Sequence, residues 1–187
     1  MIKKTLAILA GGKSSRMNYN NKALLLYKEK TFIENIINAG NEFNEIIIIA
    51  NKIEDYKNLN LKVYHDIYIG NGPLSGIHSA LKNSKNHKVL CIACDMPLIS
   101  KKTLDIIGEV DGDYEVLVPN VDNRLQPMCA IYSKSLIPKI EKALLNGENK
   151  LQKFILSTKY KVLENNLCIK DFSNINTEKE YELLEGI

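Results

Sequence analysis

The feature of this sequence that most limits its fold is an apolar run that ends in a pair of glycines. Leu6–Ala10 contains only apolar or small residues, Gly11 and Gly12 follow directly, and the cations Arg16 and Lys22 come soon after. A buried strand that ends in such a loop presents backbone N–H groups to a phosphate, because glycine allows both the backbone angles and the close approach. The stretch therefore predicts a strand followed by a nucleotide triphosphate site. The alternative is a solvated glycine turn.

Spacing excludes two better-known phosphate loops. A Walker A loop requires Gly-x-x-x-x-Gly-Lys-Ser/Thr, and no glycine precedes Lys22 at that interval. A Rossmann fingerprint requires Gly-x-Gly-x-x-Gly directly after a strand, and the stretch Gly70–Gly76 has one residue too many before its last glycine. An oxidoreductase of the Rossmann type is therefore disfavoured, because its dinucleotide loop lacks the required spacing.

Apolar strands and helical patterns alternate through the first part of the chain. Uniformly apolar strands that alternate with helices indicate a mainly parallel sheet covered on both sides, which predicts an α/β fold, a Rossmann-like three-layer αβα sandwich. A capping box at Thr31 and Glu34 predicts the start of a helix, and Gly40 predicts its end. The strands predicted here are Thr5–Ala10, Glu45–Ala50, Leu61–Tyr64 and Lys88–Ala93, and the later helices are Leu74–Asn83 and Lys101–Val110.

The pattern changes from Glu115 onward, without a linker, a repeat or a low-complexity tract. A length of 187 residues fits a single domain with one large core. A second capping box, formed by Thr177 and Glu180, predicts a terminal helix. The other elements predicted here are strands at Glu115–Val118, Met128–Tyr132 and Tyr160–Leu163, a loop at Asn120–Pro127, and helices at Leu136–Leu145 and Leu151–Leu156.

Small and polar residues follow several of these strands, at the edge where such sheets bind ligands. Gly11, Asn51, Asp66 and Asp95 all occupy that edge. Asp95 comes directly after a buried apolar strand and shortly before a proline, a placement that suits a Mg²⁺ ion bound together with phosphate oxygens. The alternatives are structural: a helix cap for Asp95 and a surface turn for Asp66.

Composition limits the class of partner. A net charge of +3 suits anionic small molecules and falls well short of a nucleic-acid-binding surface, so no nucleic acid is expected as a partner. The longest apolar run, about Ile46 to Ala50, is far too short to span a bilayer. The first residues lack the long apolar segment and the cleavage site of a signal peptide. We therefore expect a cytoplasmic protein that does not engage a membrane.

The CxxC pair Cys91 and Cys94 raises the question of a metal or redox site. The pair lies along a predicted strand, where residues three apart point to opposite faces about 10 Å from each other, so buried thiols are expected instead. His65, His78 and His87 lack metal-ligand spacing, and ordinary structural roles are expected for them.

The glycine loop also matches a longer and more specific pattern. Leu9–Met17 reads LAGGKSSRM and Lys22–Leu24 reads KAL, which resembles the signature of the nucleotidyltransferases, most closely the molybdenum cofactor guanylyltransferases of the MobA family. The later segments CDMP (Cys94–Pro97), RLQPM (Arg124–Met128) and DFSNINT (Asp171–Thr177) resemble further motifs of that family. The resemblance implies the fold of the nucleotide-diphospho-sugar transferases. The chain departs from the family pattern at Asn18, Asn21 and Asn149-Lys150.

In the family that this chain resembles, GMP passes from GTP to molybdopterin that carries molybdenum, and pyrophosphate is released. The resemblance implies GTP and a molybdopterin-type cofactor as partners, Mg²⁺ as the cofactor, and transient contacts with other proteins of the cofactor pathway. It assigns residues 1–112 approximately to GTP and Mg²⁺, and residues 113–187 approximately to the acceptor. The implied site residues are Leu9, Ala10, Gly11 and Gly12 for base and phosphates; Arg16 and Lys22 for phosphate charge in catalysis; Asn51 and Asp66 for the nucleoside; Asp95 for catalysis and the metal; and Asn174 and Asn176 for the acceptor.

Two further alternatives stay open. A sister nucleotidyltransferase that uses CTP or a sugar-phosphate acceptor has the same loop, because base choice depends on the shape of the pocket. A non-catalytic protein would bind GTP without turnover. The presence of Lys22, Asp95 and the segment Asn174–Asn176 argues against that second alternative.

Overall fold

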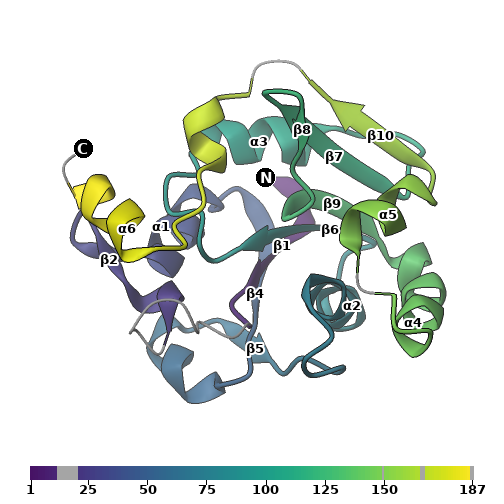
Figure 1. Ribbon diagram of the computed structural model, residues 1–187, viewed down its shortest axis with the longest axis horizontal. Coiled ribbons are helices and arrows are strands. Elements are labelled where there is room, and N and C mark those ends of the chain that lie inside the picture. Colours follow the sequence, from purple (N-terminus) through teal and green to yellow (C-terminus); the bar gives the residue numbers. More distant parts are fainter. Residues whose placement is uncertain (12–20, 149, 165–166, 186–187) are drawn as a thin grey trace.

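The computed structural model describes residues 1–11, 21–148, 150–164 and 167–185, and it centres on one mixed β-sheet (Figure 1). In order across the sheet, the strands are β10 (Tyr160–Leu163), β7 (Val116–Val121), β9 (Cys129–Ser133), β6 (Lys88–Ala93), β1 (Ile2–Leu9), β4 (Phe43–Ile49) and β5 (Lys62–Tyr64), with β8 (Arg124–Leu125) paired to β7. β1 pairs in parallel with β4 and β6, β4 with β5, and β7 with β10. In this described sheet, only β8 and β9 run antiparallel to the other strands, which confirms the predicted, mainly parallel arrangement.

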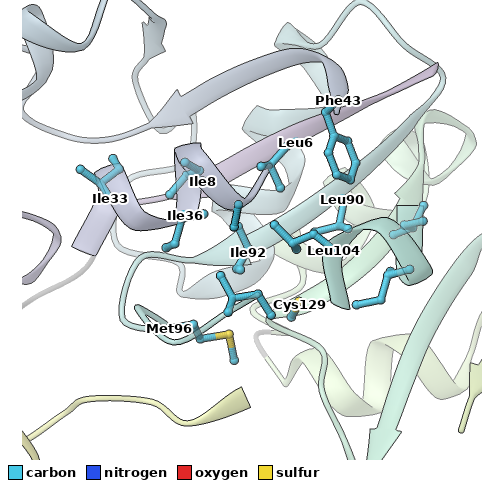
Figure 2. Packing of buried hydrophobic residues seen from close by; sticks show 14 of the residues in the cluster. Leu6, Ile8, Ile33, Ile36, Phe43, Leu90, Ile92, Met96, Leu104 and Cys129 are labelled. Atoms are coloured by element: carbon cyan, nitrogen blue, oxygen red, sulfur yellow. The ribbon is translucent and has the colours of Figure 1, made fainter. Parts of the chain in front are cut away.

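Helices cover both faces of the sheet, which confirms the three-layer sandwich (Figure 1). α1 (Phe32–Ala39) and α3 (Lys101–Glu109) lie on one face, and α2 (Pro73–Asn83), α4 (Ile137–Leu145) and α5 (Leu151–Leu156) lie on the other. Leu6 and Ile8 of β1 pack with α1 and α3, in the core that Figure 2 shows, whereas Ala7 and Leu9 pack with α2. Burial on both faces explains why the second half of this strand, from Leu6 to Leu9, is uniformly apolar. None of the described helices is long and apolar enough to cross a membrane.

α1 begins and ends where the sequence predicts. Thr31 Oγ1 accepts a hydrogen bond from Glu34 N at 3.3 Å, and Glu34 Oε2 accepts from Thr31 N at 2.7 Å, which completes the capping box. Gly40 follows the helix with a φ of −90°, so no left-handed turn requires a glycine there. A Cβ at this position would lie 2.2 Å from Leu6 Cδ2. Glycine is needed because the end of the helix meets β1 at close range.

Two short hairpins lie outside the predictions. β8 pairs with the end of β7 inside the segment Asn120–Pro127, so the expectation of an open loop there is wrong for its first part. The turn residues Asp122 and Asn123 have φ values of 51° and 57°, as a tight two-residue hairpin turn requires. β2 (Leu26–Tyr27) and β3 (Lys30–Thr31) form the other hairpin, also over two residues at positive φ. Neither turn contains the Asn-Gly or Asp-Gly dipeptide that signals a hairpin from sequence.

The C-terminal segment returns to the first half of the chain. α6 (Glu178–Glu185) lies beside β2 and α1 (Figure 1), where the ring of Tyr181 is 6.0 Å from that of Phe32 and its hydroxyl donates to Leu26 O at 2.9 Å. Before it, the 3₁₀ helix η4 (Ile169–Phe172) carries Asp171, which accepts hydrogen bonds from Ser100 at the start of α3. These contacts hold η4 and α6 near the carboxyl ends of the central strands.

Cys91, Cys94 and His78 pack inside the fold. Cys91 is buried in β6, as predicted, and burial raises the pKa of the neighbouring Cys94 thiol to about 12. His78 is also buried, with its Nε2 3.0 Å from Glu141 Oε1 on α4 and its ring 5.0 Å from the ring of Tyr68. Within the described ranges, no three His, Cys, Asp or Glu side chains gather as a metal site. Because burial raises the pKa values of Cys91 and Cys94, these two thiols are protonated at neutral pH and pack as small apolar groups.

Candidate active site

A cavity of about 550 Å³ lies at the carboxyl ends of β1, β4 and β6. The residues singled out from the sequence that line it are Leu9, Ala10, Gly11, Lys22, Asn51, Asp66 and Asp95. Gly12 and Arg16 lie outside the described residues, and their roles stay predictions. The fold thus brings a glycine-containing backbone loop, a lysine and two carboxylates together from separate parts of the chain.

The register of the sheet explains why these residues meet. Leu9, the last residue of β1, pairs with Ile49 of β4 on one side and with Ala93 of β6 on the other. Beyond the strand, Ala10 N donates to Ile49 O at 2.8 Å, and Cys94 N donates to Leu9 O at 3.2 Å. The segments that follow the three strands consequently leave the sheet at one edge, as their parallel order predicts.

Asp95 stands in the turn after β6 with one carboxylate oxygen unsatisfied. Its Oδ1 is buried and has no hydrogen-bond partner among the residues that the structure describes. Burial raises the pKa of Asp95, and the positive charge of Lys22 opposes this with a smaller effect. A buried oxygen without a donor is unfavourable, and a divalent cation that also binds phosphates would offset that cost. The carboxylate present therefore fits a hard cation such as Mg²⁺.

Lys22 begins a short 3₁₀ helix, η1 (Lys22–Leu24), whose position is fixed by Asn21. Asn21 Oδ1 accepts a hydrogen bond from Ala23 N of η1 at 3.1 Å. Asn21 Nδ2 donates to Asp55 Oδ2 at 2.8 Å and to Tyr56 OH at 2.9 Å. These bonds tie η1 to a second 3₁₀ helix, η2 (Ile53–Leu59), so the lysine projects from a fixed point. Its Nζ donates to Asn176 Oδ1 at 2.8 Å. Asn21, one of the departures from the family pattern, is thus the residue that anchors Lys22.

Asp66 is held by two buried serines of α2. Ser75 Oγ and Ser79 Oγ both donate to Asp66 Oδ1, the second at 3.1 Å. Ser79 Oγ also accepts from Ile67 N at 2.8 Å, which ties the following loop to the helix. One carboxylate oxygen is therefore occupied, and the other is left for a ligand. Sequence reasoning missed the roles of both serines, although two buried hydroxyls four residues apart, on the same face of a helix, are the signal that finds them.

The start of α2 also lies at the cavity. Gly70 and Gly72 line it with φ values of 85° and 72°, angles that glycine adopts at little cost. Gly72 directly precedes the helix, and Pro73 occupies its first turn, where a missing N–H leaves no bond unmade. A helix N-terminus carries partial positive charge, so this end of α2 favours an anionic ligand in the same cavity.

The segment predicted to bind the acceptor, Asn174–Asn176, contacts Lys22 of this site through the side chain of one of its two asparagines. Asn176 contacts Lys22, and the neighbouring Ile175 N donates to Asp95 O at 2.9 Å. Neither asparagine is among the described residues that line the cavity, and Asn174 is exposed. The acceptor roles of both asparagines stay predictions.

An αβα sandwich with a glycine after its first strand, a lysine and a carboxylate at the carboxyl edge of its sheet has the architecture of a nucleotidyltransferase. The chain belongs to the family described as the MobA-like NTP transferase domain, whose model matches residues 6–162. That match includes every described residue of the cavity lining. It ends before Asn174 and Asn176.

Relatives extend the likeness to almost the whole chain. A "Probable molybdenum cofactor guanylyltransferase" of Clostridium perfringens is 53% identical over 190 aligned positions, which cover 97% of this chain and 96% of that protein. The solved structure of molybdopterin-guanine dinucleotide biosynthesis protein A from Archaeoglobus fulgidus has a TM-score of 0.79 at 23% identity and covers 97% of each chain. The manganese complex of Rv0371c from Mycobacterium tuberculosis has a TM-score of 0.75 at 18% identity and covers 98% of each chain. Both structures share the fold of this protein.

Proposed function

We propose that this protein transfers GMP from GTP to a molybdopterin-type cofactor that carries molybdenum and releases pyrophosphate. The observation that carries the proposal is the cavity where the glycine loop, the Lys22 ammonium and the unsatisfied Asp95 oxygen meet. The name of the relative from Clostridium perfringens, at 53% identity, supports GMP as the transferred group and molybdopterin as the acceptor. We expect the enzyme to work in the cytoplasm on small molecules, with transient contacts to other proteins of the cofactor pathway.

The chemistry requires one anion to attack another. A terminal phosphate on the acceptor is largely ionised near neutral pH, so the reaction needs no strong general base. The barrier comes from bringing negatively charged groups into line, and it is lowered by positioning and by neutralisation of charge. Lys22 supplies a positive charge from a fixed point close to Asp95. We assign Arg16, which lies outside the described residues, to the same task.

We assign the nucleotide to the side of the cavity formed by β1, β4 and α2. Asp66 offers only its Oδ2 to the nucleoside, because the two serines of α2 occupy Oδ1. A single carboxylate oxygen suits donors such as ribose hydroxyls or base N–H groups. The backbone of Leu9, Ala10, Gly11 and Gly12 is assigned to base and phosphates, and Asn51 to the nucleoside.

We assign a divalent cation, Mg²⁺, to Asp95. When bound, such an ion neutralises charge on phosphate oxygens. This chain contributes the carboxylate itself, which is held at the end of a buried strand with one oxygen free of protein donors. The manganese in the Mycobacterium tuberculosis structure supports a divalent ion on this fold, and it leaves the choice between the two metals to experiment.

We assign the acceptor to the C-terminal part of the chain, about residues 113–187, with Asn174 and Asn176 as binding residues. The support for this is the position of Asn176 beside Lys22. An acceptor phosphate that reaches the α-phosphorus of the nucleotide must pass close to that lysine, so Asn176 lies on its path.

A guanylyl assignment has one competitor from the same class, transfer of another nucleotide such as CMP. The backbone of the glycine loop binds phosphates without regard to the base, so the loop does not choose between GTP and CTP. The discriminating measurement is a melting curve with each nucleotide triphosphate and Mg²⁺, because binding to the native state raises the melting temperature.

We expect GTP to raise the melting temperature more than ATP, CTP or UTP does. Single-turnover transfer of labelled GMP to molybdopterin then tests the reaction. Equal shifts for all four nucleotides, or a preference for CTP, would contradict the guanylyl assignment. A clear GTP shift without transfer would favour a binding protein that lacks turnover.

A further inference from the structure

The capping box of α6 makes one hydrogen bond more than the cap of a helix requires. Glu180 N donates to Thr177 Oγ1 at 3.2 Å, and Thr177 N donates to Glu180 Oε2 at 2.9 Å, which is the reciprocal pair that begins the helix. The same Glu180 oxygen accepts from Asn176 N at 2.7 Å. Glu180 therefore fixes the backbone of the residue whose side chain contacts Lys22.

The capping box of α1 provides a comparison within the same chain. Glu34 Oε2 accepts from Thr31 N at 2.7 Å and from Thr31 Oγ1 at 2.6 Å, so its described bonds all go to the capping threonine. Glu180 differs because it also holds the residue before its threonine. That residue, Asn176, is the one whose side chain contacts Lys22, which lines the cavity.

The chemistry of Lys22 fixes the orientation of the Asn176 amide. An ammonium group carries hydrogen-bond donors only, so the atom that meets Lys22 Nζ at 2.8 Å must be the amide oxygen. The amide Nδ2 of Asn176, with two N–H donors, is then available to an acceptor oxygen. Asn176 can thus contact the lysine that serves the nucleotide and the second substrate at the same time.

Three anchors hold the short segment that carries this amide. Ile175 N donates to Asp95 O, the Asn176 side chain meets Lys22, and Asn176 N donates to Glu180. The first two anchors belong to the proposed active site, and the third lies outside it. The hydrogen bond from Asn176 N is the largest cause of a lowered pKa of Glu180, which therefore stays ionised at neutral pH.

We infer that Glu180 is a positioning residue for nucleotidyl transfer, which acts through Asn176 on the Lys22 ammonium. The inference rests on the proposed function. Glu180 fixes Asn176 so that the ammonium is already in place when the phosphates arrive, and fixed placement of a charge is what accelerates such a transfer. One carboxylate therefore both caps α6 and positions a residue of the proposed active site.

The test compares Glu180→Ala with Glu180→Gln in single-turnover GMP transfer. Glu180→Ala removes the acceptor for both amides, and we expect kcat to fall about tenfold with the KM for GTP changed less than about threefold. Glu180→Gln keeps an oxygen that can accept from both amides, and we expect kcat within about threefold of the wild type. If Glu180 acted only through its negative charge, both variants would lose kcat equally, and that result would overturn the inference.

Two control variants separate positioning from helix stability. Thr177→Ala removes one half of the capping box and leaves the bond from Asn176 N to Glu180, and Glu34→Ala removes the matched cap of α1. We expect both to lower the melting temperature, as cap deletions do, and to leave kcat unchanged. A fall in kcat that tracks the melting temperature across all these variants would show that Glu180 is only a cap.

A double-mutant cycle tests whether Glu180 acts through Lys22. If it does, Glu180→Ala has no further effect on kcat in a Lys22→Met background. Full additivity of the two losses would contradict the inference. In parallel, binding of GTP, CTP and ATP with Mg²⁺ is measured for the wild-type protein, to find which nucleotide it prefers. A wild-type protein that prefers another nucleotide would overturn the guanylyl assignment, and the cycle with that nucleotide would still decide the role of Glu180.

Discussion

The two ends of the central sheet differ in how far their charged side chains are paired with one another. At the amino ends of the strands, around a cavity of about 710 Å³, charged side chains pair with one another. The pairs there are Lys4 with Asp111 at 2.9 Å, Lys101 with Asp105 at 2.8 Å and with Glu42 at 3.3 Å, and the Met1 amino group with Glu42 at 3.2 Å. At the carboxyl ends, Asp95 Oδ1 has no partner among the described residues, and Lys22 donates to a neutral amide.

The pKa shifts follow the same division. Hydrogen bonds from the chain's amino group and from Lys4 lower the pKa values of Glu42 and Asp111, respectively, at the amino end. Burial raises the pKa of Asp95 at the carboxyl end.

The ion pairs at the amino end stabilise the fold; Asp105 Oδ1 is also buried there without a hydrogen-bond partner in the described part of the chain, but Asp105 Oδ2 is paired with Lys101 at 2.8 Å. At the carboxyl end, the buried Asp95 oxygen without a donor among the described residues destabilises the fold until a ligand arrives. The difference indicates that the carboxyl end is built for binding at some expense of stability.

The largest expected effect comes from Asp95→Asn, because it removes the buried negative charge that distinguishes the carboxyl end of the sheet. The substitution keeps the size of the side chain and removes the charge that a hard cation prefers, so we expect GMP transfer to fall at least about a thousandfold. GTP binding should weaken less, because the loop amides and Lys22 still contact the phosphates. The measurement is single-turnover transfer across a Mg²⁺ titration. Wild-type turnover with unchanged Mg²⁺ dependence would exclude Asp95 as the ligand.

The same variant gives a pH dependence of stability with a definite sign. A carboxyl whose pKa is raised in the folded chain destabilises the fold above that folded pKa, and the penalty disappears as the pH falls below the unfolded value. Without ligand, Asp95→Asn should therefore be as stable as the wild type or more stable at neutral pH, and the difference should vanish in acid. Urea unfolding between pH 3 and about pH 8 measures this. A variant that is less stable at neutral pH would identify Asp95 as a structural cap.

A smaller loss is expected from Lys22→Met, which removes one charge from the carboxyl end and keeps an apolar stem. The scale for one electrostatic donor is about 2–4 kcal/mol of transition-state stabilisation. Because Lys22 lowers the pKa of Asp95, this variant should also shift the Asp95 titration upward. Both effects are read from kcat/KM and from a pH titration of the free protein. A kcat/KM within a few-fold of the wild type would show that Lys22 does not contribute to transfer. That result would favour the alternative in which the glycine loop is a solvated turn.

The smallest effect on transfer is expected from Lys4→Met, the matched change at the amino end. The Lys4 side chain is 8% exposed and its ammonium donates to Gly108 O at 2.8 Å, so its removal should cost about 1–3 kcal/mol of unfolding free energy. Transfer should stay within about twofold of the wild type, since this end of the sheet holds no part of the proposed site. Urea unfolding and the transfer assay together check the prediction. A loss of transfer without a loss of stability would show that the two ends are coupled.

Local patterns predicted most of the elements and the edge where the site lies. The apolar run before Gly11, the strand before Asp95 and the capping boxes of α1 and α6 all depend on residues close in sequence, and the structure forms each of these elements. β1 begins at Ile2, earlier than the predicted start at Thr5, and it ends at Leu9. The hairpins at β2 and β8 were not predicted, because their turns have residues other than glycine at positive φ. The segment Asn120–Pro127 is a partial error for that reason.

The sequence by itself determined the α/β order, the glycine loop, and the lysine and carboxylates that follow its strands, because hydrophobic periodicity, caps and glycine turns depend on neighbouring residues. Only the tertiary structure decided which of those groups have partners. Lys22 meets Asn176 across 154 positions of sequence, Asp66 receives the serines of α2, and Asp95 Oδ1 receives no partner among the described residues. Spacing does not encode such contacts, because they arise where packed layers bring distant segments within hydrogen-bond distance.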